Sequence, residues 1–557
     1  MSSIKNLSVV VKIRFDLEKF ILALFFAILL FIGPGSVLDH RIMHEFPYGY
    51  YASDTFQHQI RAESIKDSGN FRYEAFYIAK GFEKTIGRYP PLIYHLSVMF
   101  SYASGLETYD SIYFLVFFFA AIGVLVMYLV IRDFNRNIAI ISLPLAILTF
   151  SHPALIGFTW GHWPSVVAQF FLIVFVWCIM RMELEKSYIF ASISFSSIAL
   201  AHTSEYVFAV IFLIFFLAIR LITKNLKKIE IKNIVFTFVL SFILSIYYLI
   251  IFKYTWAAGQ PYSFFVMPVW DGNPGFYIMN FGALLVFIVA GIIFSLFRLR
   301  GMHVSLIAAL AMFLSGFSNY IGFDTRAFQI RFFWPVYLAV FFGFGFYMLL
   351  KFAIKKWNMA FSVIIFAIFT VLLTGIVKIP SVPYYIETAS PGIMDIYHWS
   401  ALRWLSANTE PDSKIYFFYG DIYGQDALLR SSKRLHFQVD PDSFINAIKE
   451  RKIKRFYTSE LPGDGGGGIT VRKGLFSFEP AVNVLKHEVF FGPQDICRFN
   501  YLIFDRGSRQ QVLAQYNLLI ASELLKKDYV KPVFENELVV ILKNNNPGAD
   551  CIEERNL

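Results

Sequence analysis

Long runs of apolar residues, each about the length of a membrane-spanning helix, recur from about residue 18 to residue 377. A hydrocarbon core about 30 Å thick needs roughly 20 helical residues at a rise of 1.5 Å each, so these runs predict transmembrane helices. We place about eleven of them, at residues 18–34, 109–131, 136–151, 164–180, 187–202, 205–222, 233–252, 280–297, 303–320, 331–350 and 358–377. The shorter run 92–106 predicts a helix lying against the bilayer surface.

The pattern changes after residue 377, where charged residues become as frequent as in soluble proteins. Strand-like runs alternate with helical stretches, the strands at 414–418, 455–458, 501–504 and 538–542 and the helices at 443–452 and 510–527. The predicted fold is therefore an α-helical polytopic membrane domain, residues 1–377 with a large first outer loop at 35–108, followed by an α/β domain at 378–557.

Composition and charge fix the setting of this fold. Of 557 residues, 57% are hydrophobic and 64 are Phe, which excludes a soluble protein. Lys and Arg are concentrated in the N-terminal segment and in every second loop between the apolar runs. Because basic loops stay on the cytoplasmic side, this predicts a cytoplasmic N-terminus and an extracytoplasmic C-terminal domain. The net charge of +10 thus reflects orientation in the membrane, and we expect no nucleic-acid partner. No small-residue cleavage site follows the first run, so we expect it to be retained.

Cysteine is rare in the chain. Cys178 falls in an apolar run, whereas Cys497 and Cys551 lie near the C-terminus. Three cysteines at these spacings define no metal site, and at most one disulfide, between Cys497 and Cys551, is possible.

The first outer loop concentrates ionisable side chains. Ser53 is suited to cap a helix that runs to about residue 68, where Gly69 ends it. Spacings of three and four residues place Asp54, His58 and Arg61 on one face of this helix. Asp54 either complements the helix dipole or carries chemistry.

After this helix the chain returns to the membrane through Arg88 and the rigid pair Pro90–Pro91. An acidic residue early in a large outer loop, a basic residue before Pro-Pro-Leu, a juxtamembrane helix and many further spans together resemble the GT-C superfamily of integral-membrane glycosyltransferases. This superfamily includes protein O-mannosyltransferases, aminoarabinose transferases and oligosaccharyltransferase catalytic subunits. The resemblance covers roughly the first 380 residues. It implies that Asp54 is the general base or helps to hold a metal, and that Arg88 contacts the donor's phosphate.

A second basic cluster is predicted on the same side of the membrane. The segment SNYIGFDTRAFQIR (318–331) leads into FFWPVYL and is similar to the arginine-bearing late span of GT-C enzymes. Arginine binds phosphate through a planar fork of donors, so Arg326 or Arg331 is a candidate for binding a lipid phosphate. The alternative is that both reach lipid headgroups, and that Asp324 only pairs with Arg326.

Histidines mark three further outer ends. The candidates are His152, His162, His202 and Glu205. With Asp54 and His58 they either complete a site for a divalent cation, Mg or Mn, or orient substrate hydroxyls, or form interfacial hydrogen bonds. Residues 150–164 contain no acid, and the Trp-Trp-Asp-type motif expected of an oligosaccharyltransferase is missing. Both departures favour a monophosphate-linked donor over metal-dependent oligosaccharyl transfer. Beyond the candidate Mg or Mn ion, the sequence predicts no cofactor.

The outer segment 253–281 is rich in aromatic residues. Trp256, Tyr262 and Trp270 are candidates for stacking on a sugar and closing over a lipid donor. The alternative is an interfacial aromatic belt. The glycine run 463–468 lacks the Lys-Ser/Thr of a phosphate loop, so it predicts a surface turn.

Taken together, these patterns predict inverting sugar transfer from a polyprenyl-phosphate-linked donor to a protein, lipid or glycan acceptor at the outer membrane face. Membrane lipids are the other expected partner. A transporter, or a non-catalytic assembly subunit with an external binding domain, is the alternative. Transporters usually hold ionisable residues near the midplane, whereas here they collect at the outer ends.

Overall fold

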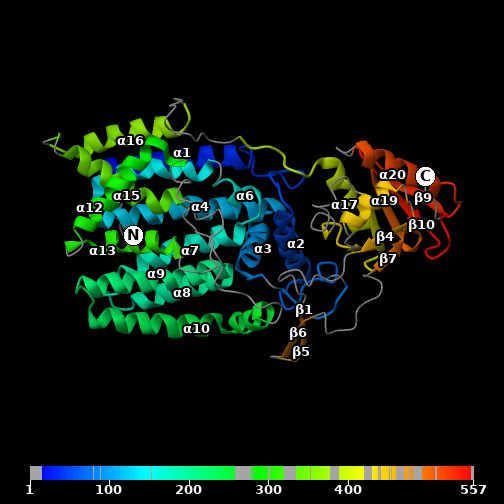
Figure 1. Ribbon diagram of the computed structural model, residues 1–557, viewed down its shortest axis with the longest axis horizontal. Helices are drawn as coiled ribbons and strands as arrows, with labels where there is room; N and C mark the ends of the chain where they lie inside the picture. Colours follow the sequence, from blue (N-terminus) through cyan, green and yellow to red (C-terminus); the bar gives the residue numbers. More distant parts are fainter. Residues whose placement is uncertain are drawn as a thin grey trace, which may run out of the picture.

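The molecule has a helical body on one side, an α/β region on the other, and the helices α2 and α3 between them (Figure 1). This computed structural model describes residues 16–553 except 80, 88, 152–153, 258–277, 279, 299–300, 319–333, 352, 355, 377–387, 419–429, 437–440, 451, 453, 459–469, 475–476, 481–491 and 508–510.

Each predicted apolar run coincides with an apolar helix of the helical body. Among the described residues, four helices are long and apolar enough to cross a membrane: α1 (Leu17–Val37), α4 (Thr108–Phe134), α9 (Thr203–Ile222) and α10 (Lys228–Ala257). Shorter apolar helices are α5 (Arg136–Ser142) with the 3-10 helix η1 (Leu143–Phe150), α7 (Trp163–Ile179), α8 (Ser187–Ala201), η3 (Gly282–Leu284) with α12 (Leu285–Phe297), α13 (Val304–Ser315), α15 (Trp334–Lys351) and α16 (Met359–Leu373). The helices are confirmed, whereas eleven crossings remain a prediction.

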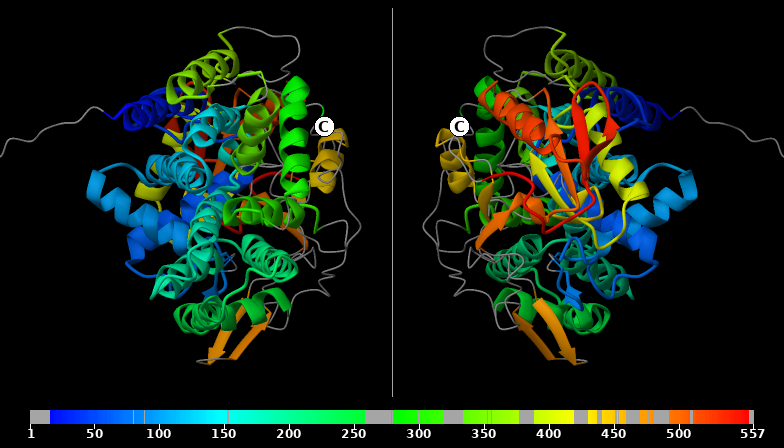
Figure 2. Two further views of the ribbon diagram at one scale, coloured as in Figure 1. Left: turned by 90° about the vertical axis from the view of Figure 1, so that its left-hand side faces the viewer. Right: turned by 90° about the vertical axis from the view of Figure 1, so that its right-hand side faces the viewer.

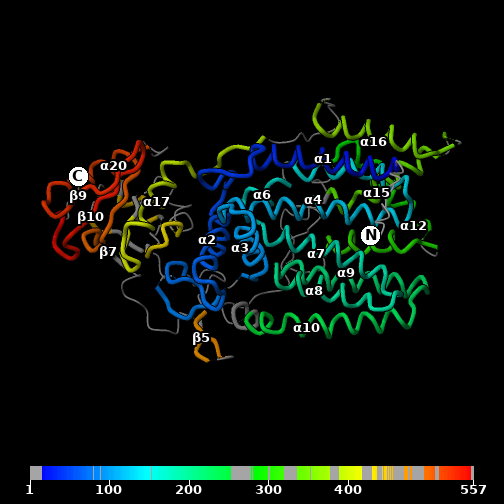
Figure 3. The backbone as a smooth tube through the Cα atoms, turned by 180° about the vertical axis from the view of Figure 1, so that it is seen from behind, coloured from blue at the N-terminus to red at the C-terminus, as the bar shows by residue number. Residues whose placement is uncertain are grey.

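Helix α10 shows why this body belongs in lipid. It lies at the edge of the body (Figure 3) and turns Phe242, Ile243 and Leu244 outward, each at least half exposed. Its small polar residues Ser241 and Ser245 are buried instead. An apolar outside and a polar inside are stable only where the solvent is hydrocarbon. The chain is therefore a membrane protein.

One predicted run, 136–151, is not a single α-helix. It begins as α5 and tightens at Leu143 into the 3-10 helix η1, in whose first turn Pro144 lies. Proline has no N–H for the α-helical hydrogen bond, so the change of helix type falls where proline requires it.

The outer loop forms the two predicted helices, α2 (Ser53–Ser68) and α3 (Leu92–Ser104). Gly69 ends α2 in the left-handed conformation, at φ +70°. The prediction that Ser53 caps α2 is wrong. Ala52 is the N-cap, without a side-chain hydrogen bond, because the N–H of Tyr51 donates to the carbonyl of Thr159 and fixes the chain one residue earlier.

The C-terminal α/β region is built on a five-stranded sheet of order β3-β2-β8-β10-β9, in which β2 is parallel to β3 and β8 while β10 is antiparallel to β8 and β9. Its elements are α17 (Ile396–Asn408), β2 (Lys414–Phe418), β3 (Leu435–His436), α19 (Pro441–Lys449), the strand pair β4 (Arg455–Thr458) and β7 (Gly492–Asp495), η8 (Ile496–Arg498), β8 (Tyr501–Asp505), α20 (Gln511–Leu524), β9 (Val530–Glu535) and β10 (Val539–Asn544). All four predicted strands and both predicted helices are present.

Helix α17 is fixed to this sheet through His398. Nδ1 of His398 donates to the carboxylate of Asp395 at 2.6 Å, and Nε2 lies 3.5 Å from a carboxylate oxygen of Asp505 in β8. Burial alone would lower the pKa of His398, but these two carboxylates raise it to about 9. The imidazolium therefore joins helix to sheet at neutral pH.

The outer loop and the C-terminal region share a small second sheet. Strand β1 (Thr85–Ile86) pairs antiparallel with β5 (Thr470–Gly474), which pairs with β6 (Ser477–Pro480). This hairpin, orange in Figure 2, projects from the side of the molecule, where Phe478 packs with Ile86 and Ile251 of α10. Backbone hydrogen bonds between β1 and β5 therefore join the parts on either side of residue 377. The division into two domains at that residue remains a prediction.

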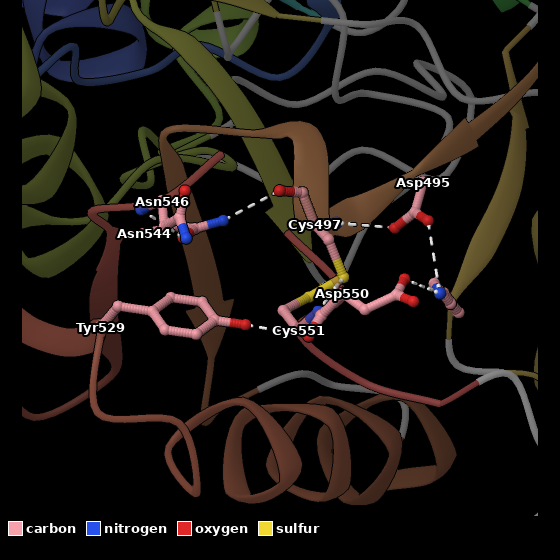
Figure 4. The surroundings of a disulfide bond; sticks show 8 residues. Asp495, Cys497, Tyr529, Asn544, Asn546, Asp550 and Cys551 are labelled. Atoms are coloured by element: carbon pink, nitrogen blue, oxygen red, sulfur yellow. Dashed lines mark hydrogen bonds and ion pairs between the residues drawn. A yellow bond between two sulfur atoms is a disulfide. The ribbon is translucent and has the colours of Figure 1, made fainter. Parts of the chain in front are cut away.

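The one disulfide that the sequence allowed is formed. Cys497 and Cys551 are bonded, with their Cα atoms 5.3 Å apart. Figure 4 shows the surrounding hydrogen bonds, in which the Tyr529 hydroxyl donates to the carbonyl of Asp550 and the Asn544 amide donates to the carbonyl of Cys497. Disulfides persist in oxidising compartments, which agrees with the predicted extracytoplasmic position of this region.

Candidate active site

The first turn of α2 is held against the connection between α6 (Ile156–Thr159) and α7. Gly161 lies so close that a Cβ there would be 2.5 Å from the backbone N of Thr55 and 3.0 Å from Cβ of Asp54. Its φ of +84° is also one that suits glycine. Asp54 itself is half-buried. Two segments about a hundred residues apart therefore meet at the predicted catalytic carboxylate.

His58 is packed one turn below Asp54. Its side chain is buried, its Nδ1 and the Tyr94 hydroxyl share a hydrogen bond of 2.8 Å, and it also hydrogen-bonds the backbone of Gly161. Burial holds the pKa of His58 well below its usual range, and the charges of Arg61, His162 and His202 lower it further. A neutral imidazole engaged on both sides favours a role in holding Gly161 against α2.

Arg61, the third residue of the predicted face, has a different partner. Its Nε lies 2.8 Å from a carboxylate oxygen of Glu74, and its guanidinium stacks on Tyr89 at 4.9 Å from the ring centre. A Cβ on Gly87 would lie 3.1 Å from the same Glu74 oxygen. This pair therefore braces the backbone that leads to Arg88.

A buried carboxylate, that of Glu205, lies in the first turn of α9. Glu205 accepts hydrogen bonds from the Ser165 hydroxyl and from the Gln169 amide at 3.2 Å, both on α7. Its other oxygen accepts from Nδ1 of His202, the single residue between α8 and α9. The carboxylate of Glu205 therefore ties α7 to the joint between α8 and α9.

The described residues place five of the predicted side chains at this end of the helical body. The ring of His58 on α2 lies 6.1 Å from that of Trp163 at the start of α7, and Ser165 of α7 donates to Glu205 beside the α8–α9 joint, so these three segments converge. The other candidates lie outside the described residues: Arg88, Arg326, Arg331, His152, Tyr262 and Trp270, together with the side chain of Trp256, whose backbone belongs to α10. Their roles remain predictions.

The described donor groups bear on the predicted metal site. Within the part of the chain that the structure describes, no group of three or more His, Cys, Asp or Glu is placed to hold a metal ion. Both oxygens of Glu205 already accept hydrogen bonds. The described residues do not fit the predicted Mg or Mn site.

The opposite half of α2 is fixed by the C-terminal region. Glu63 is buried and pairs with Arg403 of α17 and with Lys433, whose Nζ lies 2.8 Å away and also contacts Asp67 at 2.6 Å. Burial alone would raise the pKa of Glu63, but these two cations lower it below its usual range. Helix α2, which carries Asp54 in its first turn, is therefore anchored on the α/β region (Figure 1).

Sequence reasoning missed Gly161, Tyr94 and the α7 pair Ser165 and Gln169. The pair carried a usable signal, because two polar residues four apart in an apolar run lie on one face and need a partner. Gly161 carried none, since its neighbours come from α2.

Sequence comparison finds no relative: no protein-family model and no curated protein matches the chain. Solved structures do match it, at 12% identity. One is the Archaeoglobus fulgidus oligosaccharyltransferase tethered with an acceptor peptide containing the NVT sequon, at a TM-score of 0.51 over 94% of this chain and 74% of that one. Another is ArnT from Cupriavidus metallidurans bound to undecaprenyl phosphate, at a TM-score of 0.50 over 94% and 98%.

In two other structures of the archaeal enzyme, AglB, the match spans 65% of its length, less than two thirds. A third, at a TM-score of 0.46, 13% identity and 75% of this chain, is a complex with Zn and sulfate. ArnT and the oligosaccharyltransferase are both GT-C glycosyltransferases, so the resemblance predicted from the outer loop is confirmed at the level of the fold.

Proposed function

We propose that this chain is a membrane glycosyltransferase, which moves a sugar from a polyprenyl-phosphate-linked donor to an acceptor at the outer face of the membrane with inversion. One observation carries most of the proposal: in a chain with the GT-C fold, Asp54 lies in the first turn of α2, where the α6–α7 connection packs against it at Gly161. The neighbour ArnT is bound to undecaprenyl phosphate, which supports a lipid-linked donor here.

In the proposed step, an acceptor oxygen attacks the anomeric carbon from the face opposite the phosphate. Asp54 takes the proton of that oxygen as the new bond forms. The bond between the anomeric carbon and the phosphate oxygen breaks, and the polyprenyl phosphate leaves with the electron pair. Arg88, Arg326 and Arg331 would stabilise its charge. Trp256, Tyr262 and Trp270 would cover the sugar.

The acceptor is proposed to be a protein, lipid or glycan. The archaeal neighbour was tethered with an acceptor peptide, which supports the first class. The proposed orientation has a cytoplasmic N-terminus, a transmembrane part at 1–377 and an extracytoplasmic part at 378–557. It places Asp54 away from cytoplasmic nucleotide sugars, so the donor arrives already linked to lipid.

The test is transfer in proteoliposomes from a radiolabelled polyprenyl-phosphate sugar, supplied with candidate acceptors. Asp54→Asn should lower the rate by about 10²–10⁴-fold, the usual contribution of a general base, with unchanged folded yield. Asp39→Asn, at an exposed carboxylate of the same outer segment, is the matched control and should transfer at the wild-type rate.

Each alternative gives a different result. Label that crosses the bilayer without a new glycosidic bond would indicate a transporter. If neither transfer nor transport occurred, an assembly subunit would be indicated. Equal loss of rate and folded yield in Asp54→Asn would make Asp54 a structural residue.

A further inference from the structure

The joint between α8 and α9 holds a paired histidine and carboxylate beside the proposed site. The side chain of Glu205 is only 4% exposed, whereas that of His202 is 29% exposed. The pair therefore has one buried member and one member that reaches the surface of the helical body.

The carboxylate has a full set of partners. One oxygen accepts from Ser165 and Gln169, and the other accepts from His202. An ionised carboxylate so placed accepts hydrogen bonds and donates none. The imidazole nitrogen that faces it, Nδ1, must therefore carry a hydrogen.

This arrangement fixes the tautomer of the neutral ring. When Nδ1 is the donor, Nε2 keeps its lone pair and becomes a hydrogen-bond acceptor. The same logic operates where a buried carboxylate orients a histidine in serine proteases. The bond also restrains rotation of the ring, so Nε2 has a defined direction.

The position of the ring favours use by a substrate. Glu205, which holds the ring, also accepts from Ser165, four residues after Gly161, and between them the ring of Trp163 lies 6.1 Å from that of His58. His202 is therefore held by the same segment that Gly161 places beside Asp54. Sugars and their acceptors present many hydroxyl donors, and a fixed acceptor nitrogen is complementary to a hydroxyl.

We propose that Nε2 of His202 accepts a hydrogen bond from a substrate hydroxyl, and that Glu205 is the positioning residue that keeps the ring in the required tautomer. This inference rests on the proposed function, since it needs a hydroxyl-bearing substrate at the site. The hydroxyl belongs either to the donor sugar or to the acceptor.

The test compares variants that separate the hydrogen bond to Glu205 from the acceptor at the Nε2 position. In His202→Asn the side-chain amide can still donate to Glu205, but no acceptor remains at the Nε2 position. In His202→Gln the amide oxygen can take that position. We expect His202→Asn to lose about 10-fold to 100-fold in kcat/KM at normal folded yield, and His202→Gln to recover part of this loss.

Glu205→Gln and a distant histidine complete the set. An amide beside Nδ1 favours the opposite tautomer, so Glu205→Gln should lose as much as His202→Asn. His303→Asn is the matched control, because His303 caps α13 and asparagine caps helices well; it should keep wild-type activity.

Two measurements show whether the hydroxyl belongs to the donor sugar or to the acceptor. Equilibrium binding of the polyprenyl-phosphate sugar without acceptor should weaken in His202→Asn if the hydroxyl belongs to the donor sugar. A raised KM for the acceptor at unchanged donor affinity would assign it to the acceptor, and either result supports the inference.

The inference is overturned if His202→Asn transfers like wild type while Asp54→Asn does not. It is also overturned if Asn and Gln lose activity and folded yield equally. Absence of transfer by the wild type, or full transfer by Asp54→Asn, would instead refute the proposed function.

Discussion

Replacing Gly161 by alanine adds one methyl group where the α6–α7 connection meets the first turn of α2. That carbon would lie 2.5 Å from the backbone N of Thr55 and 2.7 Å from the carbonyl carbon of Asp54, whereas ordinary contact begins at 3.4 Å. Both obstructing atoms belong to the backbone, so no side chain can turn aside. The turn must retreat by about 0.9 Å, the difference between 3.4 and 2.5 Å, or the loop must move equally.

A displacement of about 1 Å in a reacting group lowers rates by about 10²-fold. We therefore expect Gly161→Ala to lower kcat for transfer by about 10²-fold, with little change in donor affinity. The left-handed φ of +84° adds about 1–2 kcal/mol of backbone strain to the folded state. The assay is transfer in proteoliposomes together with the thermal midpoint of the purified protein.

Two other glycines separate strain from displacement. Gly69 and Gly105 have φ of +70° and +76°, but an added Cβ at either meets nothing within 4 Å. Gly69→Ala and Gly105→Ala should therefore show the same strain and nearly full transfer. If folded Gly161→Ala transferred at the wild-type rate, or lost no more than these two variants, Gly161 would not set the position of Asp54.

Two further predictions concern stability. Glu63→Gln leaves Arg403 and Lys433 without their buried carboxylate and should lower the free energy of unfolding by about 3 kcal/mol, seen as a lower thermal midpoint; an unchanged midpoint would show that the anchor contributes nothing. The pKa of His398 is raised from 6.5 to about 9, so its stabilising contribution, about 3 kcal/mol at most, is complete below pH 6.5 and is lost as the pH rises through 9. Thermal midpoints measured from pH 6 to 10 should fall over that window in the wild type and not in His398→Gln; parallel curves would contradict the assignment.

Local signals carried most of the fold. Apolar length predicted the helices of the body, and β-branched and aromatic runs predicted strands such as 414–418 and 455–458 at their observed bounds. Gly69 was correctly predicted as the end of α2, because the left-handed cap depends on one residue. Long-range contacts decided what could not be predicted. The start of α2 moved because Tyr51 is bound to Thr159.

The site divides in the same way. Residue type and order were enough to single out Asp54, His202 and Glu205 as candidates. Their geometry was not predictable, because it depends on neighbours from other elements, Gly161 above all. Glu63 was not singled out from the sequence, because its partner Arg403 lies 340 positions away.

That separation also has a consequence in time. Ribosomes add about 5–20 residues per second, so roughly 20–70 s pass between synthesis of Glu63 and synthesis of its partner Arg403. During this interval the nascent helix has no C-terminal region to rest on. We therefore expect α2 to reach its final position only after α17 has emerged and docked, and chains that end before Arg403 to lack this anchor.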